Sequence, residues 1–163
     1  MSYNRFLFVG LGGSGGSTLG HLKNNIKQWL AETGQPTDIP IGWQFLHIDT
    51  RDESDIGSVL QLSANEYVGL IPSGGMTFES VQNSLDTKRS LHPDLETWRV
   101  DPTDFPHSLG MGAGQYRAVG SAVALNYAGK IKDALEGAFR RLNGGGAKAS
   151  LSTLYTAVTG EAT

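Results

Sequence analysis

The chain has 163 residues and a formal net charge of −3, with 39% hydrophobic and 18% charged residues. These values are typical of one globular domain with a sizeable core, and the acidic balance argues against nucleic-acid binding through a broad basic patch. The absence of cysteine excludes disulfides, thiol catalysis and cysteine-ligated metals. No apolar run approaches the roughly 20 residues of a membrane span. We therefore expect a single domain over residues 1–163, with a cytoplasmic location as the default.

A short apolar stretch leads into a glycine-rich segment near the start of the chain. Residues 5–9 are mostly aromatic and aliphatic and predict a buried strand, and five of the seven residues from Gly10 to Gly16 are glycine. A helical pattern follows, with Ser14 and Ser17 as candidate N-caps. Strand, glycine loop and helix in this order are typical of a phosphate-binding site, because glycine allows close approach and the helix start supplies free N–H donors.

The segment Ile39–Ile48 predicts a second strand, which begins after Pro40 and is followed by Asp49. Two parallel strands joined by a helix form a right-handed unit. This connection places the glycine loop and Asp49 at the carboxyl edge of the sheet, where open α/β folds bind ligands. The sequence therefore predicts an α/β, Rossmann-like fold with a mostly parallel sheet and flanking helices.

The middle of the chain is less regular. We interpret residues 53–110 as an insertion within the domain that packs over the sheet edge, with short helices expected over residues 58–62 and 78–85.

A second glycine-rich segment precedes another helical pattern. Residues 109–117 read Leu-Gly-Met-Gly-Ala-Gly-Gln-Tyr-Arg, and an apolar stripe then predicts one long helix over residues 119–142. Asn143 and Gly144 are stop signals for this helix. Residues 144–148 are expected to be a flexible linker, and residues 151–158 are expected to form a third strand.

The first glycine motif alone leaves several ligands open. Gly10, Gly12 and Gly15 satisfy the dinucleotide pattern, but they also suit a structural turn without a ligand. Asp49 follows Gly16 by 33 residues, whereas the ribose-binding acid of dinucleotide folds comes about 20 residues on. Two glycine loops that each open a helix at one sheet edge favour a polyphosphate held from two sides. None of the four histidines has metal-ligand spacing, and His47 is expected to pack inside the protein.

Three motifs together resemble the tubulin/FtsZ superfamily. They are Gly10-Leu-Gly-Gly-Ser-Gly-Gly16, then Ile48-Asp49-Thr50 at the end of the second strand, then Gly112-Ala-Gly-Gln-Tyr-Arg-Ala-Val-Gly120 at the start of a helix. The sequence is most similar to bacterial tubulin-like proteins outside the main FtsZ group. The resemblance covers residues 5–143 and implies GTP or GDP as the ligand, with Mg²⁺ as a candidate companion of the phosphates.

The resemblance also implies which residues surround the nucleotide. By motif position, the residues that contact the phosphates are Gly12, Gly13, Ser14, Gly15 and Gly16. Ser17 or Thr18 lies close to the ribose or base, and Asp49 lies in the loop on the metal side. The residues around the γ-phosphate are Gly112, Ala113, Gly114 and Gln115, with Arg117 as the cation that meets its charge. No residue is assigned as a metal ligand or as catalytic. The implied partners are the nucleotide and other copies or subunits of a larger self-associating assembly.

One family signature is absent. The loop Gly-Gly-Gly-Thr-Gly-Ser-Gly does not occur, and Gly144-Gly145-Gly146 lacks its threonine and serine. We therefore expect the chain to be the amino-terminal part of a GTP-binding domain or a reduced homologue, which binds nucleotide but does not hydrolyse it alone; hydrolysis is an expectation for a longer protein. The alternatives are a dinucleotide- or ATP-using Rossmann enzyme, including the ThiF-like group, and an interaction module whose glycines are only structural.

Overall fold

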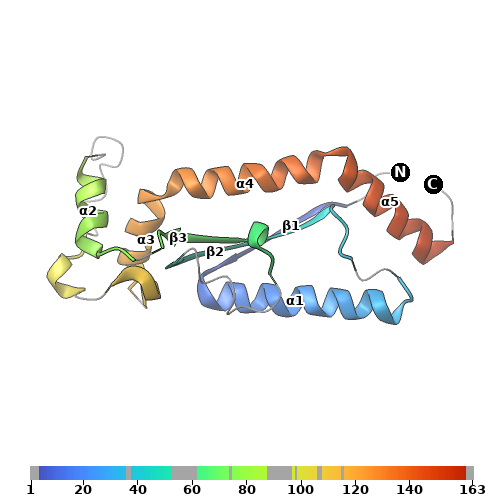
Figure 1. The fold of residues 1–163 in the computed structure, drawn as a ribbon, viewed down its shortest axis with the longest axis horizontal. Helices are drawn as coiled ribbons and strands as arrows, with labels where there is room; N and C mark the ends of the chain where they lie inside the picture. Colours follow the sequence, from blue (N-terminus) through green and yellow to red (C-terminus); the bar gives the residue numbers. More distant parts are fainter. Residues whose placement is uncertain are drawn as a thin grey trace.

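The computed structural model shows a three-stranded parallel sheet with helices on both faces (Figure 1). The strand order is β1 (Phe6–Leu11), β2 (Trp43–Asp52) and β3 (Tyr67–Ile71), and both neighbouring pairs are parallel. This architecture confirms the predicted α/β, Rossmann-like fold and the predicted parallel pairing of the first two strands.

The structure describes most of the chain. The described residues are 4–35, 38–52, 62–73, 75–87, 97, 99–105, 108–114 and 116–160. None of the described helices is long and apolar enough to cross a membrane.

Helices α1 (Gly12–Glu32) and α4 (Ala128–Asn143) cover opposite faces of the sheet (Figure 1). Successive side chains of β2 alternate between the two faces, as the period of a strand requires. His47 faces α1, where its ring lies against Gly16, and Leu46 and Ile48 belong to the core cluster on the side of α4. Both faces of β2 are therefore buried, which explains its nearly continuous apolar sequence.

The remaining helices gather at the two ends of the sheet (Figure 1). At the carboxyl ends of the strands lie α2 (Phe78–Asp86) and α3 (Arg117–Asn126). At the amino ends lies α5 (Gly145–Thr159). The side chain of Leu151 in α5 lies so close to Gly42 that a Cβ there would be 2.3 Å from Leu151 Cδ1. Helix α5 therefore lies at the opposite end of the sheet from α2 and α3 (Figure 1).

The predicted glycine loop is wrong: the segment between β1 and α1 contains no loop. β1 runs to Leu11 and α1 begins at Gly12, so residues 12–16 form the first turn of the helix. The chain reverses its course at Gly12, whose φ of +67° favours glycine. Leu11 occupies the N-cap position, and no side chain caps the helix. Ser14 and Ser17, the predicted caps, therefore lie inside α1.

The middle of the chain contributes a strand that the sequence analysis does not predict. Residues 67–71 form β3 beside β2, although they fall in the segment predicted to be irregular. This strand has only five residues and contains Gly69, so its pattern is too short to be distinctive. The expected helix over residues 78–85 is confirmed as α2. The expected helix over residues 58–62 lies outside the described residues except for its last residue.

The predicted long helix is interrupted at Tyr127. α3 ends at Asn126 and α4 begins at Ala128, because Tyr127 has φ −107° and ψ 22° and leaves the helical region. The hydroxyl of Tyr127 donates a hydrogen bond to Met76 Sδ at 3.3 Å, which anchors the break to the loop before α2. The predicted stop is confirmed, since α4 ends at Asn143.

The predicted linker and third strand after α4 are wrong. Both segments belong to α5, which begins directly after Gly144. The buried side chains of Ala147 and Leu151 are four residues apart and form its packed face. Residues 151–158 include threonine, tyrosine and valine, which favour a strand, but the burial of this helical face outweighs that local preference.

Candidate functional site

The first turn of α1 exposes its backbone at the carboxyl end of the sheet. A Cβ built on Gly12 or on Gly13 would meet no described heavy atom within 4 Å. The first turn contains no acidic residue, and no side chain caps it. The first N–H groups of a helix have no partner within the helix, and they carry a partial positive charge. Among the described residues, the start of α1 is thus an uncapped helix end that attracts anions, with open space beside Gly12 and Gly13.

The other glycines of this segment serve close packing between β1 and α1. A Cβ on Gly10 would lie 2.5 Å from the carbonyl oxygen of Gly15, and one on Gly15 would lie 2.8 Å from the carbonyl carbon of Gly10. A Cβ on Gly16 would lie 2.3 Å from Cε1 of His47. The predicted phosphate-binding glycines therefore divide into an open pair, Gly12 and Gly13, and a packed pair, Gly15 and Gly16.

His47 and Asp49 lie on the face of β2 that α1 covers. His47 is completely buried and its Nε2 is 2.9 Å from the carbonyl oxygen of Gly12. Asp49 is 7% exposed, and its Oδ2 is 3.7 Å from the same nitrogen. The expectation that His47 packs inside the protein is confirmed. Asp49 lies at the predicted sheet edge, but its carboxylate is turned into the protein.

The second glycine segment is attached to the end of β2. The N–H of Ala113 donates a hydrogen bond to Oγ1 of Thr50 at 3.0 Å. Gly112 and Gly114 have φ values of +93° and +58°, which favour glycine. A Cβ on Gly112 would lie 3.2 Å from Cγ of Arg51. The segment therefore folds as a tight turn against the last residues of β2, after the 3₁₀ turn Leu109–Met111.

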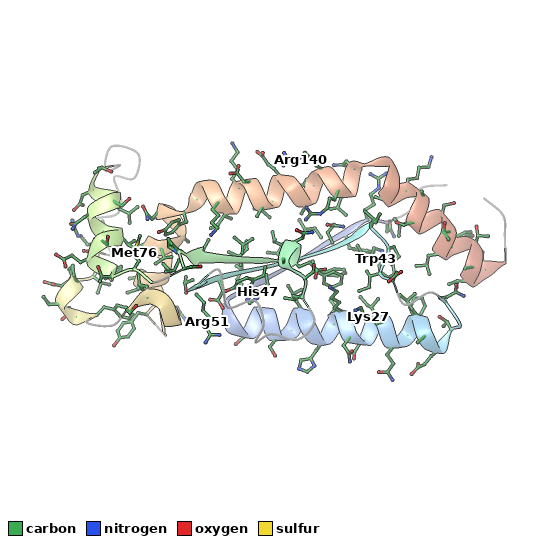
Figure 2. The ribbon with its side chains drawn as sticks, in the orientation of Figure 1. Lys27, Trp43, His47, Arg51, Met76 and Arg140 are labelled. Atoms are coloured by element: carbon green, nitrogen blue, oxygen red, sulfur yellow. The ribbon has the colours of Figure 1, made fainter. Side chains whose placement is uncertain are left out.

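The two glycine segments border the same end of β2. Leu11, which precedes the first turn of α1, is paired with Ile48. Thr50, which holds the second segment, follows Ile48 by two residues, or about 7 Å along a strand. Figure 2 shows Arg51 at the end of the sheet where α1 begins. The structure thus brings together the segments that the sequence analysis assigns to one ligand.

The remaining predicted site residues have different surroundings. Arg117 is exposed as the first residue of α3 and forms no ion pair with another described residue. Ser17 is partly buried in α1, and Thr18 donates a hydrogen bond from Oγ1 to the carbonyl oxygen of Ser14 at 2.9 Å. Gln115 lies outside the described residues.

Two side chains that shape this region, Thr50 and His47, are not predicted from the sequence to hold the glycine segments. Thr50 links the second glycine segment to the sheet, and His47 contacts the first. Both residues are polar and lie near the end of a buried strand, on opposite faces. That pattern is the sequence signal that could have indicated their roles. Among the described residues, no group of three or more His, Asp or Glu side chains is placed to hold a metal ion.

Comparison with known proteins gives one match, to a family model described as tubulin like, which covers residues 7–160. Searches of curated proteins and of solved structures give no significant match. The family match spans the sheet, both glycine segments and the helices at the two ends of the sheet. The chain therefore belongs to the tubulin-like family.

Proposed function

We propose that this chain is a GTP-binding module that holds the nucleotide phosphates at the carboxyl end of β2. The observation that carries the proposal is the meeting of two glycine turns at that point. The open turn at Gly12 and Gly13 begins α1, and the turn at Gly112 to Gly114 is bonded to Thr50. Membership of the tubulin-like family supports GTP as the nucleotide.

The residues at the start of α1 suit a phosphate chemically. A phosphate is an anion that accepts several hydrogen bonds, and the uncapped helix start offers backbone donors and a positive dipole end. The open space beside Gly12 and Gly13 lets such a group approach the main chain. Arg117 begins α3 directly after the second turn, where its exposed guanidinium would meet the charge of a further phosphate.

Two features favour this proposal over a dinucleotide enzyme. A ribose-binding acid presents its carboxylate to the ligand, whereas Asp49 is buried and lies near His47. A dinucleotide would also leave the second glycine turn without a role, although that turn is fixed at the same strand end.

Calorimetric titration with GTP, GDP, ATP and NAD, each with and without Mg²⁺, tests the proposal. The informative variant is Gly13→Glu, because a carboxylate on the first turn of a helix is tolerated by the fold but repels a phosphate. Gly145→Glu is the matched control, since Gly145 also lies in the first turn of a helix with open space around it, but at the other end of the sheet.

We expect the wild-type chain and Gly145→Glu to bind GTP with similar affinity, and Gly13→Glu to bind at least about tenfold more weakly while it unfolds at a similar temperature. Preference for NAD, or equal binding by Gly13→Glu and the wild-type chain, would contradict the proposal. A protein that binds none of the four nucleotides would instead support the interaction module.

Self-association is the second part of the proposal. We propose that GTP favours contact between copies of the chain or with further subunits, and that hydrolysis needs residues from such a partner. Sedimentation velocity with GTP and with GDP, together with phosphate-release measurements, tests this part. A chain that remains a monomer with both nucleotides at high concentration and still releases phosphate would contradict it.

A further inference from the structure

We propose that His47 is a positioning residue that fixes the first turn of α1 in its phosphate-binding geometry. The inference rests on the proposed function for its ligand, but the contact that carries it exists without a ligand. His47, labelled in Figure 2, is in the middle strand. Its Nε2 reaches the carbonyl oxygen of Gly12, the residue at which the chain changes from strand to helix.

Three neighbours hold the ring of His47 in place. Gly16 lies beside the ring, where a Cβ would be 2.3 Å from Cε1. The ring of Tyr67 in β3 lies 5.2 Å away, centroid to centroid. Nε2 lies 2.9 Å from the carbonyl oxygen of Gly12, and no part of the residue is exposed to solvent. A ring confined in this way keeps a fixed position against the first turn of α1.

The direction of the hydrogen bond follows from its partners. A carbonyl oxygen only accepts, so Nε2 carries the hydrogen and donates it to Gly12. Asp49 Oδ2, at 3.7 Å from Nε2, is beyond direct hydrogen-bond distance. Nδ1 is buried and has no hydrogen-bond partner among the described residues. The structure thus assigns to His47 the tautomer with hydrogen on Nε2.

This hydrogen bond controls the part of the turn that faces the ligand. Gly12 has a φ of +67°, and glycine has few steric restraints on its backbone. Without the bond, the carbonyl of Gly12 would lose a buried donor, and the peptide that joins Gly12 to Gly13 would be held only by the helical hydrogen bonds of α1. The N–H of Gly13 belongs to that peptide, so its direction toward a phosphate depends on His47.

Two substitutions test the hydrogen-bond donor of His47 separately from the volume of its side chain. In His47→Gln the amide nitrogen can occupy the position of Nε2 and donate to Gly12, whereas His47→Met fills similar space without a donor. We expect His47→Gln to bind GTP within about twofold of the wild-type chain and His47→Met to bind about tenfold more weakly, the effect of one lost hydrogen bond. Equal binding by all three proteins would overturn the proposal.

Nuclear magnetic resonance of the nucleotide-free protein decides the positioning role independently of GTP. We expect the imidazole nitrogens of His47 to show the Nε2-protonated tautomer. We also expect the Gly12 carbonyl carbon and the Gly13 amide to shift in His47→Met and to return in His47→Gln. An Nδ1-protonated ring, or unchanged resonances in His47→Met, would overturn the inference. If the wild-type chain binds no GTP, the proposed function fails while these resonances still decide the contact.

Discussion

The glycines in the first turn of α1 have opposite surroundings, which predicts opposite effects of alanine. Gly16→Ala places a Cβ against the ring of His47, and we expect it to lower the free energy of unfolding by about 1–3 kcal/mol. Gly13→Ala enters open space and is expected to leave stability unchanged or to raise it by up to about 1 kcal/mol. Urea denaturation of both variants measures the difference.

A double-mutant cycle provides the control for the Gly16 prediction. If the cost of Gly16→Ala comes from the ring, it must be smaller when His47 is already alanine. The same cost in both backgrounds would show that the helix start itself, and not His47, excludes the side chain.

Asp101 gives a prediction on pH. The hydroxyl of Thr103, followed by its backbone N–H, donates to the Asp101 carboxylate and lowers the pKa below the usual 3.8. A lowered pKa in the folded state adds stability above pH 3.8 that is lost as the pH falls through the folded pKa. We therefore expect Thr103→Val to raise the pKa of Asp101 toward its usual value, as measured by a carboxyl-carbon titration. An unchanged pKa would contradict this explanation.

At the residue scale, the sequence motifs predict which positions meet but not what each glycine does. The spacing of Gly10, Gly12 and Gly15 is the same whether a glycine faces a ligand or a neighbouring backbone. Only the approach of α1 to β1 and His47 separates the two kinds. The role of His47 also depends on the register between β2 and the helix start, which no local pattern contains.

Among the elements, α4 is joined to the sheet by a side chain that the helical pattern does not single out. Lys130 is partly buried and donates from Nζ to the carbonyl oxygen of Gly69 in β3 at 2.7 Å. We expect Lys130→Met to lower the free energy of unfolding by about 1.5–3 kcal/mol, since the carbonyl of Gly69 would lose a charged, partly buried donor. Lys132→Met is the matched control, because its side chain is 73% exposed. Equal effects in thermal unfolding would contradict a specific role for Lys130.

Helix α5 gives a second test among the elements. Leu151 is 5% exposed and packs on Gly42, whereas Val158 is 48% exposed. We expect Leu151→Ala to cost about 2–5 kcal/mol, as for other buried leucines, and Val158→Ala to cost less than about 1 kcal/mol. Denaturant unfolding distinguishes the two. If residues 151–158 formed a strand, the far-ultraviolet circular dichroism of the chain would show less helix than the structure contains. We do not expect this result.

Elements with a clear apolar pattern are predicted best. β1, β2 and α1 follow from such patterns, a short helix is expected where α2 forms, and the end of α4 follows from Asn143 and Gly144. β3 is too short for its pattern to stand out, and α5 is decided by the burial of Leu151 rather than by local preference. The break at Tyr127 coincides with a hydrogen bond to Met76, a partner distant in sequence. The elements that are not predicted from the sequence are those whose structure depends on tertiary contacts.

In the whole molecule, the candidate ligand site and helix α5 lie at opposite ends of the sheet. The strands point their carboxyl ends toward the two glycine turns, whereas α5 packs beside the amino ends (Figure 1). The family match extends from β1 through α5 and includes both ends. We therefore expect nucleotide binding to perturb one end of the sheet and to leave the other unchanged.

The most direct test of this account is a titration of the isotope-labelled chain with GTP and Mg²⁺, followed by the backbone amide resonances. The account predicts that the amides of Gly13, Ser14 and Gly15 shift together with those of Ala113 and Gly114, while the amides of α5 do not change. Shifts confined to one glycine segment, shifts centred on α5, or no shifts at saturating GTP would contradict the claim that both segments hold one nucleotide.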